Sequence, residues 1–448
     1  MFNKILIANR GEVALRIIRT CKEMGIRTVA LYSQADEDCL HVSMADEAYC
    51  IGPAPSKESY LNVANILSTA LLAQVDAIHP GYGFLAENAD FAEICEAHNI
   101  KFIGPTAEHI RLMGDKVTAR TTMENGNVPV IKGSPLLDTI EEAKAYAQKI
   151  GYPIMLKATA GGGGKGMRIV NNEEEMENSY NITRSEAQAF FGNDQVYMEK
   201  FIQNPRHIEM QVVADKFGNV CHLGERDCTI QRRNQKLIEE SPSAVVPADV
   251  REKMAKAAIN AVKAINYEGV GTIEFLFDGK DFYFMEMNTR LQVEHCVTEL
   301  VTNKDLVREQ ISIAAGEKLS FKQEDIKING HAIECRINAE NPDKDFMPCP
   351  GEIEGSIAPG GFGVRVDSHA YANYKSPPHY DSMIAKLICW GENREDARNR
   401  MLRALNDYVI LGVKTTIPFH KRILKNKAFI NNKYSTKFVE EELMKVEV

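Results

Sequence analysis

Apolar and polar positions alternate along the first hundred residues in a way that predicts a parallel sheet covered by helices. Short apolar runs, KILIAN, TVALYS, VDAIH and KFIG, are separated by segments of helical period, among them GEVALRIIRTCKEMG, which ends at Gly25. Strands that alternate with helices at this spacing form a doubly wound sheet. We place this α/β domain at residues 1–114. Its first strand-to-helix turn, ANRGE, lacks G-x-G-x-x-G, so no dinucleotide site is predicted.

The pattern changes in the rest of the chain, which is predicted to be α+β. Residues 115–203 are expected to form a linker helix (about 113–127) and a small unit that closes with the strand QVYMEKFI. In residues 204–448 long strands alternate polar and apolar positions, and two hairpins are predicted in RHIEMQVVADKFGNVCHLGERD and GTIEFLFDGKDFYFMEMN. The segments from HAIECRINAE to EDARNRMLRALNDY are expected to complete an α+β layer.

Composition and charge narrow the classes of function. The chain has 448 residues, and its net charge of -9 argues against nucleic acid as a bulk partner. No apolar run approaches the ~18 residues that span a membrane. The N-terminus, MFNKILIANRGE, is predicted to be a first strand and not a signal peptide. The ten cysteines form no C-x-x-C pair and are expected to be reduced core residues of a cytoplasmic protein.

The segment KATAGGGGKGMRIV, from Lys157 to Val170, contains four consecutive glycines. Glycine is costly to order, and its usual benefit is that the main chain can approach a ligand closely, often a phosphate. The segment is not a P-loop, because Gly166 follows Lys165 where Ser or Thr is required. Its flanks look like short strands, so the sequence predicts a glycine-rich flap within a hairpin. A surface hairpin tip without a ligand is the alternative.

The second hairpin carries two acidic residues on one predicted face. If its turn closes over three residues, Glu274 lies directly across from Glu286, with Phe284 and Asn288 on the same face of the return strand. Two opposed carboxylates destabilise a sheet unless a cation lies between them. Mg²⁺ prefers carboxylates, phosphate oxygens and water. We therefore predict a metal face here, with a solvated polar strand face as the alternative.

Further charged residues lie on either side of this face. In NTRLQVEH the alternation is predicted to continue, with Arg290, Gln292 and Glu294 on one side. Upstream, ERDCTIQRRNQK contains basic residues suited to anionic ligands, unless it is a basic surface loop: Arg226, Arg232, Arg233 and Lys236. Together with the flap and the lysines at 116, 157 and 200, the metal face predicts a Mg-ATP site.

Eight motifs in this order resemble the biotin carboxylase family of ATP-grasp enzymes over essentially the whole chain. They are IANRGE, HPGYGFLAEN, LMGDK, KATAGGGGKGM, MEKFI, ERDCTIQRRNQK, EMNTRLQVEH and ECRINAE. The resemblance implies an ATP-grasp fold whose small middle domain is a lid over ATP. It also implies an ATP-dependent ligase that uses ATP, Mg²⁺ (or Mn²⁺) and bicarbonate to carboxylate biotin on a carrier protein, through carboxyphosphate.

The resemblance implies roles for individual residues. The nucleotide would contact Lys116, Lys157, Gly163, Gly164, Glu199, Lys200, Phe201, Ile202, His207, Gln231, Asn234, Glu274 and Glu286. The implied metal ligands are Glu274, Glu286 and Asn288. The bicarbonate site would comprise Lys236, Arg290 and Val293, with Glu294 as general base, while Arg336 and Tyr82 would face biotin. The catalytic residues among these would be Glu294, Arg290, Lys236 and Arg336.

Two positions depart from the family pattern. Asn234 stands where many relatives carry histidine near the ribose, and altered nucleotide affinity is expected because asparagine can still bond a hydroxyl. Cys296 stands where proline is usual, which changes either the packing or the local backbone.

The sequence also predicts partners. The only late Met-Lys pair is Met444-Lys445, with no room for a biotin-carrying domain, so biotin is expected on a separate biotin carboxyl carrier protein. A carboxyltransferase subunit would set the acceptor: acetyl-CoA, as in fatty acid biosynthesis, propionyl-CoA or pyruvate. The relatives suggest a homodimer. Two alternatives are another ATP-grasp ligase, for carbamoyl phosphate or purine synthesis, and a non-catalytic nucleotide-binding regulatory subunit.

Overall fold

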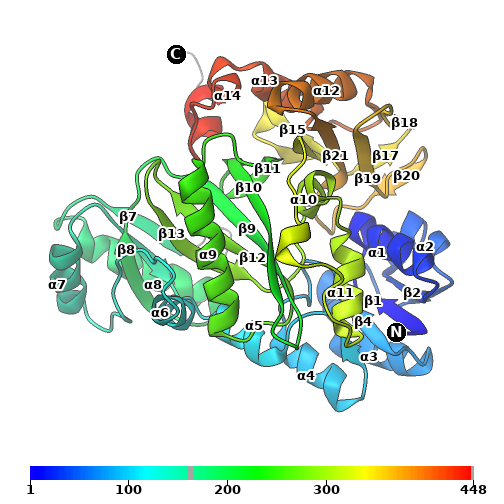
Figure 1. Cartoon of the computed structure of the whole chain (residues 1–448), viewed down its shortest axis with the longest axis horizontal. Coiled ribbons are helices and arrows are strands. Elements are labelled where there is room, and N and C mark those ends of the chain that lie inside the picture. The colour runs from blue at the N-terminus through cyan, green and yellow to red at the C-terminus, as the bar shows by residue number, and fades with distance from the viewer. Residues whose placement is uncertain (160–165, 445–448) are drawn as a thin grey trace.

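The structure is a computed structural model that describes residues 1–159 and 166–444 (Figure 1). The chain begins with a five-stranded sheet in the order β3-β2-β1-β4-β5, in which all paired strands are parallel. The elements of this part are β1 (Lys4–Ile7), α1 (Gly11–Glu23), β2 (Arg27–Tyr32), α2 (Leu40–Met44), β3 (Glu47–Cys50), α3 (Val63–Leu72), β4 (Ala77–His79), α4 (Ala89–Ala97), β5 (Lys101–Phe102) and α5 (Ala107–Gly114).

Apolar residues cover both faces of this sheet. In β1, Ile5 and Ile7 pack into a cluster with α1, while Leu6 points into a second cluster with residues of α3 and α4. A strand that is buried on both sides is typical of a parallel sheet with helices on each face. The predicted doubly wound domain is therefore confirmed.

A three-stranded sheet, β7-β6-β8, forms the core of the small unit at the left of Figure 1. Its elements are α7 (Ile140–Ile150), β6 (Ile154–Ala158), β7 (Met167–Val170), α8 (Met176–Phe191) and β8 (Val196–Lys200). Helix α6 (Lys116–Asn125) precedes this unit and packs in the core of the largest sheet. Strands β6 and β7 pair antiparallel, which confirms the predicted hairpin. The flap residues Gly163 and Gly164 lie outside the described residues.

The predicted linker helix is wrong in one respect, because it is two helices. The break lies at Asp115, whose side chain accepts a hydrogen bond of 2.7 Å from the backbone N–H of Thr118 and so caps α6. An aspartate in this position favours a new helix start over continuation of α5. The break places Lys116 at the beginning of α6.

The largest sheet has eight antiparallel strands in the order β13-β12-β9-β10-β11-β14-β21-β19. These strands are β9 (Arg206–Ala214), β10 (Val220–Arg232), β11 (Gln235–Ser241), β12 (Gly269–Phe277), β13 (Phe282–Asn288), β14 (His331–Asn338), β19 (Val364–Ser368) and β21 (Met383–Gly391). The C-terminal strands thus extend the same sheet as the two predicted hairpins, both of which are confirmed.

Helices and short strands complete this part. They are α9 (Ala248–Ala264), α10 (His295–Thr302), α11 (Leu306–Ala314), β15 (Glu340–Asn341), β16 (Met347–Pro348), β17 (Gly351–Ile353), β18 (Gly355–Ile357), β20 (Tyr374–Ser376), α12 (Arg394–Asp407), β22 (Val409–Leu411), α13 (Ile417–Lys425) and α14 (Lys427–Ile430). Helix α9 crosses in front of the sheet in Figure 1 and packs on it, while α11 packs on the opposite face together with α1. Every residue of β9 is consequently buried.

The hairpin β12–β13 pairs Glu274 with Glu286, as predicted, but by a different route. Its turn closes over four residues, because Phe277 pairs with Phe282, and a register shift then follows Phe284. This bulge restores the predicted pairing and turns Phe284 toward the apolar core. The prediction that Phe284 shares the acidic face is therefore wrong, because one extra residue in a strand reverses its alternation.

Two further predictions concern the state of the cysteines and membrane-spanning segments. All ten cysteines lie within the described residues and are unpaired. Eight of them are buried as predicted, whereas Cys50 is exposed and Cys349 is half-buried, so the prediction of core residues is wrong for these two. In the part of the chain that the structure describes, no helix is long and apolar enough to cross a membrane.

Candidate active site

A cavity of about 1290 Å³ lies between the small unit and the two larger sheets. Every predicted site residue within the described residues lines it: Tyr82, Lys116, Lys157, Glu199, Lys200, Phe201, Ile202, His207, Gln231, Asn234, Lys236, Glu274, Glu286, Asn288, Arg290, Val293, Glu294 and Arg336. These residues are far apart in the sequence, so their convergence is a property of the fold. The structure does not describe the two remaining predicted residues, Gly163 and Gly164.

Three carboxylates on neighbouring strands form an acidic row, of which Glu274 and Glu286 line the cavity and Glu209 is buried beside them. Glu274 on β12 pairs with Glu209 on β9 and with Glu286 on β13. Asn288 donates a hydrogen bond of 2.9 Å from Nδ2 to Glu274 Oε1. Burial raises the pKa of Glu286, and the adjacent Glu274 carboxylate raises it further. Carboxylate and amide oxygens that repel one another without a cation are the donor set that Mg²⁺ prefers, so these residues suit a magnesium ion.

His207 lies against this row. Its Nε2 is 3.1 Å from Glu274 Oε2 and 3.7 Å from Glu209 Oε2. Burial alone would lower the pKa of His207, but the Glu274 carboxylate raises it to about 9. The imidazole therefore adds a positive charge to the acidic row at neutral pH.

The ammonium group of Lys236 connects the acidic row with Glu294. Its Nζ lies 2.7 Å from Glu209 Oε2, 2.9 Å from Glu274 Oε1 and 2.7 Å from Glu294 Oε1. Burial opposes the charge on Lys236, yet the carboxylates raise its pKa well above the ordinary value. Lys236 is thus a fixed cation at the centre of the cavity.

Glu294 lies between two cations at the start of α10. Its Oε1 accepts from Lys236, and its Oε2 accepts a hydrogen bond of 3.0 Å from Arg336 Nη2. Burial alone would raise the pKa of Glu294, but Lys236 and Arg336 lower it to about 2. Arg336 is held in turn by Glu239 Oε1, at 2.6 Å from its Nε. The carboxylate is therefore ionised and lies within reach of an anion bound by Lys236.

The predicted alternation does not continue through NTRLQVEH, because β13 ends at Asn288 and an irregular segment leads to α10. Arg290 and Glu294 nevertheless both line the cavity. Arg290 donates from Nε to Glu87 Oε2 at 2.8 Å and from Nη2 to Asn288 Oδ1 at 2.8 Å. Gln292 donates from Nε2 to Glu274 Oε1 at 2.8 Å. The segment is fixed by these side-chain bonds and not by strand pairing.

The opposite side of the cavity is formed by the small unit. Lys157 on β6 forms an ion pair with Glu199 on β8. Burial lowers the pKa of Lys116, although the Glu286 carboxylate acts in the opposite direction. The ammonium of Lys200 binds the carbonyl oxygens of residues 151 and 152, each at 2.9 Å, and so ties β8 to the start of β6. Lys116 and Lys157 both line the cavity, and lysine ammonium groups are suited to phosphate.

The turn between β10 and β11 also reaches the cavity. Arg233 and Asn234 occupy its two central positions with φ of 49° and 63°. Asparagine adopts this left-handed region more readily than most residues, so the backbone conformation of the turn favours asparagine at position 234. Gln231, on the preceding strand, lines the cavity beside it.

The alternative that ERDCTIQRRNQK is a basic surface loop is wrong, because the segment forms β10 and the start of β11. Arg226 is fully buried, and its guanidinium is saturated by protein groups: Glu209, Gln211, Thr272, Gln292 and Thr298. Arg232 forms an ion pair with Asp345. Arg226 and Lys236 both pair with the acidic row, and of these two Lys236 also lines the cavity.

Sequence reasoning missed several residues of the site. Glu209 is one, although the alternation of His207, Glu209 and Gln211 in an otherwise apolar strand was a usable signal of a polar face. Glu87 and Glu239 are others, and each fixes an arginine from another element. No local pattern marks them, because their partners are distant in the sequence.

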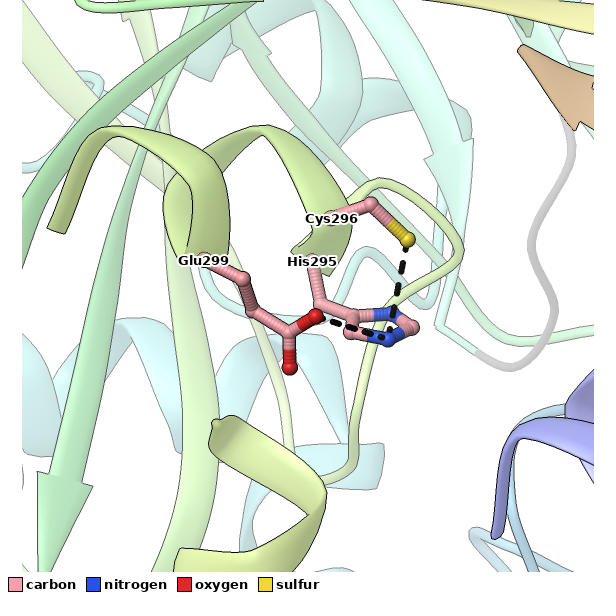
Figure 2. A group of neighbouring side chains, drawn as sticks. All are labelled: His295, Cys296 and Glu299. Carbon is pink, nitrogen blue, oxygen red and sulfur yellow. Dashed lines mark hydrogen bonds and ion pairs between the residues drawn. The ribbon is translucent and has the colours of Figure 1, made fainter. Parts of the chain in front are cut away.

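A second group of potential ligands lies at the start of α10, as Figure 2 shows. His295 Nε2 is 3.7 Å from Cys296 Sγ and 3.9 Å from Glu299 Oε2. Glu299, however, is paired with Arg16 and Arg365, which oppose a bound cation. Burial raises the pKa of the Cys296 thiol well above its ordinary value. The group is therefore a packed structural cluster.

Position 296 lies in the first turn of α10. Proline is tolerated there, because the first N–H groups of a helix have no intrahelical partner. Cys296 is completely buried, and its thiol donates to Asp367 Oδ2 at 3.3 Å. The helical backbone suits either residue, so the structure supports a change of packing.

Three successive parts of the chain match known protein families. Residues 1–110 match the family described as "Biotin carboxylase, N-terminal domain", and residues 334–441 match "Biotin carboxylase C-terminal domain". Residues 115–322 match "Carbamoyl-phosphate synthase L chain, ATP binding domain". The terminal matches distinguish the chain from other ATP-grasp ligases, which answers the first alternative.

Similar proteins cover the whole chain. Biotin carboxylase 1 of Bacillus subtilis is 59% identical over 443 residues, which are 98% of each chain. A crystal structure described as a biotin carboxylase–β-γ-ATP complex from Campylobacter jejuni is 53% identical, with a TM-score of 0.96 over 99% of each chain. The biotin carboxylase domain dimer of Hydrogenobacter thermophilus 2-oxoglutarate carboxylase, with MgADP, ADP and bicarbonate, is 52% identical, with a TM-score of 0.95 over 98% of each chain. The chain therefore belongs to the biotin carboxylase family of ATP-grasp ligases.

Proposed function

We propose that this chain carboxylates biotin on a separate carrier protein, with ATP and bicarbonate as co-substrates, and that the residues converging on the cavity perform both steps. The observation that carries the proposal is the position of Glu294. It is a buried carboxylate held between Lys236 and Arg336, in the same cavity as the acidic row. An ionised carboxylate can accept a proton from an anion bound next to it, and Lys236, which contacts Glu294, is one of the residues assigned to bicarbonate below.

ATP is assigned to the side of the cavity formed by the small unit. Lys116 and Lys157 are proposed to contact the phosphates together with Gly163 and Gly164, and residues 199–202 the adenine. Gln231, Asn234 and His207 would lie near the ribose. In this proposal residues 1–114, 115–203 and 204–448 are the N-terminal domain, the linker helix with the lid, and the C-terminal part.

Glu274, Glu286 and Asn288 are proposed to hold Mg²⁺ or Mn²⁺. When bound, the ion neutralises charge that develops on the transferred phosphoryl group. The surrounding residues orient these ligands: Lys236 and Gln292 both bond Glu274 Oε1.

Bicarbonate is assigned to Lys236, Arg290 and Val293. Glu294 takes the proton of bicarbonate, and the oxygen so freed attacks the γ-phosphate of ATP. The products of this step are ADP and carboxyphosphate, while the proton resides on Glu294. The positive charges of Lys236 and Arg290 stabilise the anion as it forms.

Biotin is assigned to the side of the cavity near Arg336 and Tyr82. Carboxyphosphate releases CO₂ and phosphate, and the phosphate then takes the proton of the biotin ureido nitrogen. Arg336 stabilises the enolate-like oxygen of the deprotonated biotin, which attacks CO₂ to give carboxybiotin. Glu239 holds the guanidinium of Arg336 in place for this step.

The proposed partners are a biotin carboxyl carrier protein, a carboxyltransferase subunit and a second copy of the chain. The similarity to a domain of 2-oxoglutarate carboxylase supports an acceptor chosen by the transferase, since closely similar chains serve different carboxylases. The biotin carboxylase domain of Hydrogenobacter thermophilus 2-oxoglutarate carboxylase is described as a dimer, which supports a second copy of the chain as a partner. The ten unpaired cysteines support a cytoplasmic location.

Phosphate release by the purified chain tests the proposal. ATP cleavage is measured with and without bicarbonate, and carboxybiotin formation with free biotin. We expect cleavage to require bicarbonate and carboxybiotin to form only with all three substrates. Cleavage of ATP at the same rate without bicarbonate, and no carboxybiotin, would refute the proposed function.

A further inference from the structure

Lys386 is a buried cation on β21 that the proposed mechanism does not use. Its side chain has no accessible surface. It lies behind the cavity wall, because its ammonium contacts Glu12, Val293 and the Tyr82 ring, all of which line the cavity. A lysine is almost never fully buried unless it is paired. The groups that contact its ammonium therefore indicate which parts of the site Lys386 positions.

The contacts of Lys386 join three other segments of the chain. Its Nζ donates a hydrogen bond of 2.9 Å to the carbonyl oxygen of Val293, in the segment before α10. The same Nζ lies 3.2 Å from Oε1 of Glu12, on α1. Glu12 Oε1 also accepts from the hydroxyl of Tyr82, which follows β4, and the Tyr82 ring centre lies 5.9 Å from Nζ. One ammonium thus contacts groups that sequence alone separates widely.

The surroundings keep this group charged. Burial alone would lower the pKa of Lys386, but the acidic groups around it, Glu12 and Asp367 among them, raise it. A charged hydrogen bond inside a protein is stronger and more directional than a neutral one. The Val293 peptide and the Glu12–Tyr82 pair are therefore fixed relative to each other by one atom.

We infer that Lys386 is a positioning residue that orders the bicarbonate and biotin sides of the cavity together, through the Val293 carbonyl on one side and the Glu12–Tyr82 pair on the other. The inference rests on the proposed function, which assigns Val293 to bicarbonate and Tyr82 to biotin. Loss of the ammonium frees both groups, so binding of both substrates weakens. ATP, held from the small unit, contacts neither group and binds as before.

The test is Lys386→Met in the full chain, which keeps most of the side-chain volume and removes the charge. Steady-state phosphate release and carboxybiotin formation give KM for each substrate. We expect KM for bicarbonate and for free biotin each to rise roughly 10- to 100-fold, the effect of one charged hydrogen bond. KM for ATP should stay within about twofold. Lys375→Met, at an exposed position of β20, is the matched control and should leave all three unchanged.

A double variant keeps the inference testable if Lys386→Met folds poorly, because Glu12→Gln removes the carboxylate that the single variant leaves buried and unpaired. If Lys386 holds Tyr82 through Glu12, the KM for biotin of the double variant should equal that of Lys386→Met. Where Lys386→Met does not fold, the comparison is with Glu12→Gln, and the two KM values should again be equal. If the double variant raises KM for biotin by the product of the two single-variant factors, Lys386 and Glu12 act independently, because independent effects add in free energy. That result would contradict the connection between Lys386 and Tyr82 through Glu12.

Three results would overturn the inference. One is a variant with reduced folded yield or reduced kcat but unchanged KM for bicarbonate and biotin, which is the signature of a purely structural lysine. Another is a wild-type chain that forms no carboxybiotin, which refutes the proposed function and the inference with it. The third, a normal wild type beside an unaffected Lys386→Met, refutes the inference alone.

Discussion

Replacement of Glu294 by glutamine removes the proposed general base while keeping the shape of the side chain. Only 2% of the Glu294 side chain is accessible, and its two oxygens lie 2.7 Å from Lys236 Nζ and 3.0 Å from Arg336 Nη2. Glutamine retains one acceptor oxygen. It cannot carry the charge or take a proton.

The structure separates the expected loss of stability from the expected loss of activity. Lys236 keeps Glu209 at 2.7 Å and Glu274 at 2.9 Å, and Arg336 keeps Glu239. Neither cation is left unpaired, so the free energy of unfolding should fall by about 1.5–3 kcal/mol, the value of one charged hydrogen bond. Loss of a general base costs roughly 10²–10⁴ in rate, or about 3–5.5 kcal/mol of activation free energy.

The assay is bicarbonate-dependent phosphate release alongside carboxybiotin formation, with urea unfolding of both proteins. Glu294→Gln should lower both activities by the same factor, because both need deprotonated bicarbonate, and should remain folded. Normal bicarbonate-dependent ATP cleavage in a folded Glu294→Gln protein would refute the reasoning and place the base elsewhere.

Three further predictions follow from single residues. Glu286→Gln removes one carboxylate of the acidic row and should cost roughly two to three powers of ten in turnover; near-normal turnover at saturating Mg²⁺ would contradict the metal assignment. Burial raises the pKa of Glu239 to about 7 from an ordinary 4.5, so its contribution to stability is complete below about pH 4.5 and lost as pH rises through 7. Urea unfolding should therefore show Glu239→Gln gaining stability relative to wild type between pH 5 and 8, and a constant difference would count against a raised pKa. Asn234→Val should destabilise by about 1–2 kcal/mol because φ is 63°, whereas Asn234→Gly should not, and equal thermal unfolding of the two would exclude strain at this turn.

The sequence was sufficient for the N-terminal sheet and for the existence of the acidic face. Both depend on local periodicity: apolar runs between helical segments in one case, and alternate Glu and apolar residues in the other. Burial on both faces of β1 follows directly from its continuous apolar run.

The details of the acidic face were not predictable in the same way. The four-residue turn and the bulge after Phe284 both shift the register, and their effects compensate, so Glu274 still meets Glu286. Loop length and bulges depend on packing against the neighbouring strand and helices, which alternation alone does not specify.

The burial of charged residues was also not predictable from the sequence. Arg226 stands in a charged run that looks exposed, yet it is fully buried among groups from several strands. Lys386 sits in SMIAKLICW, where a single lysine among apolar residues marks an unusual position without showing its partners. Those partners, Glu12 and Val293, are brought together only by the fold.

The central claim is that one cavity performs two steps in sequence, with Glu294 acting on bicarbonate and Arg336 acting afterwards on biotin. The most direct measurement is the ratio of carboxybiotin formed to phosphate released by Arg336→Gln, which removes the fixed charge that stabilises the biotin enolate. The account predicts that carboxylation falls by roughly two to three powers of ten, about 3 kcal/mol, while part of the bicarbonate-dependent ATP cleavage persists uncoupled. If Arg336→Gln lowers phosphate release and carboxybiotin by the same factor, Arg336 acts before carboxyphosphate exists, and the proposed order of the two steps is contradicted.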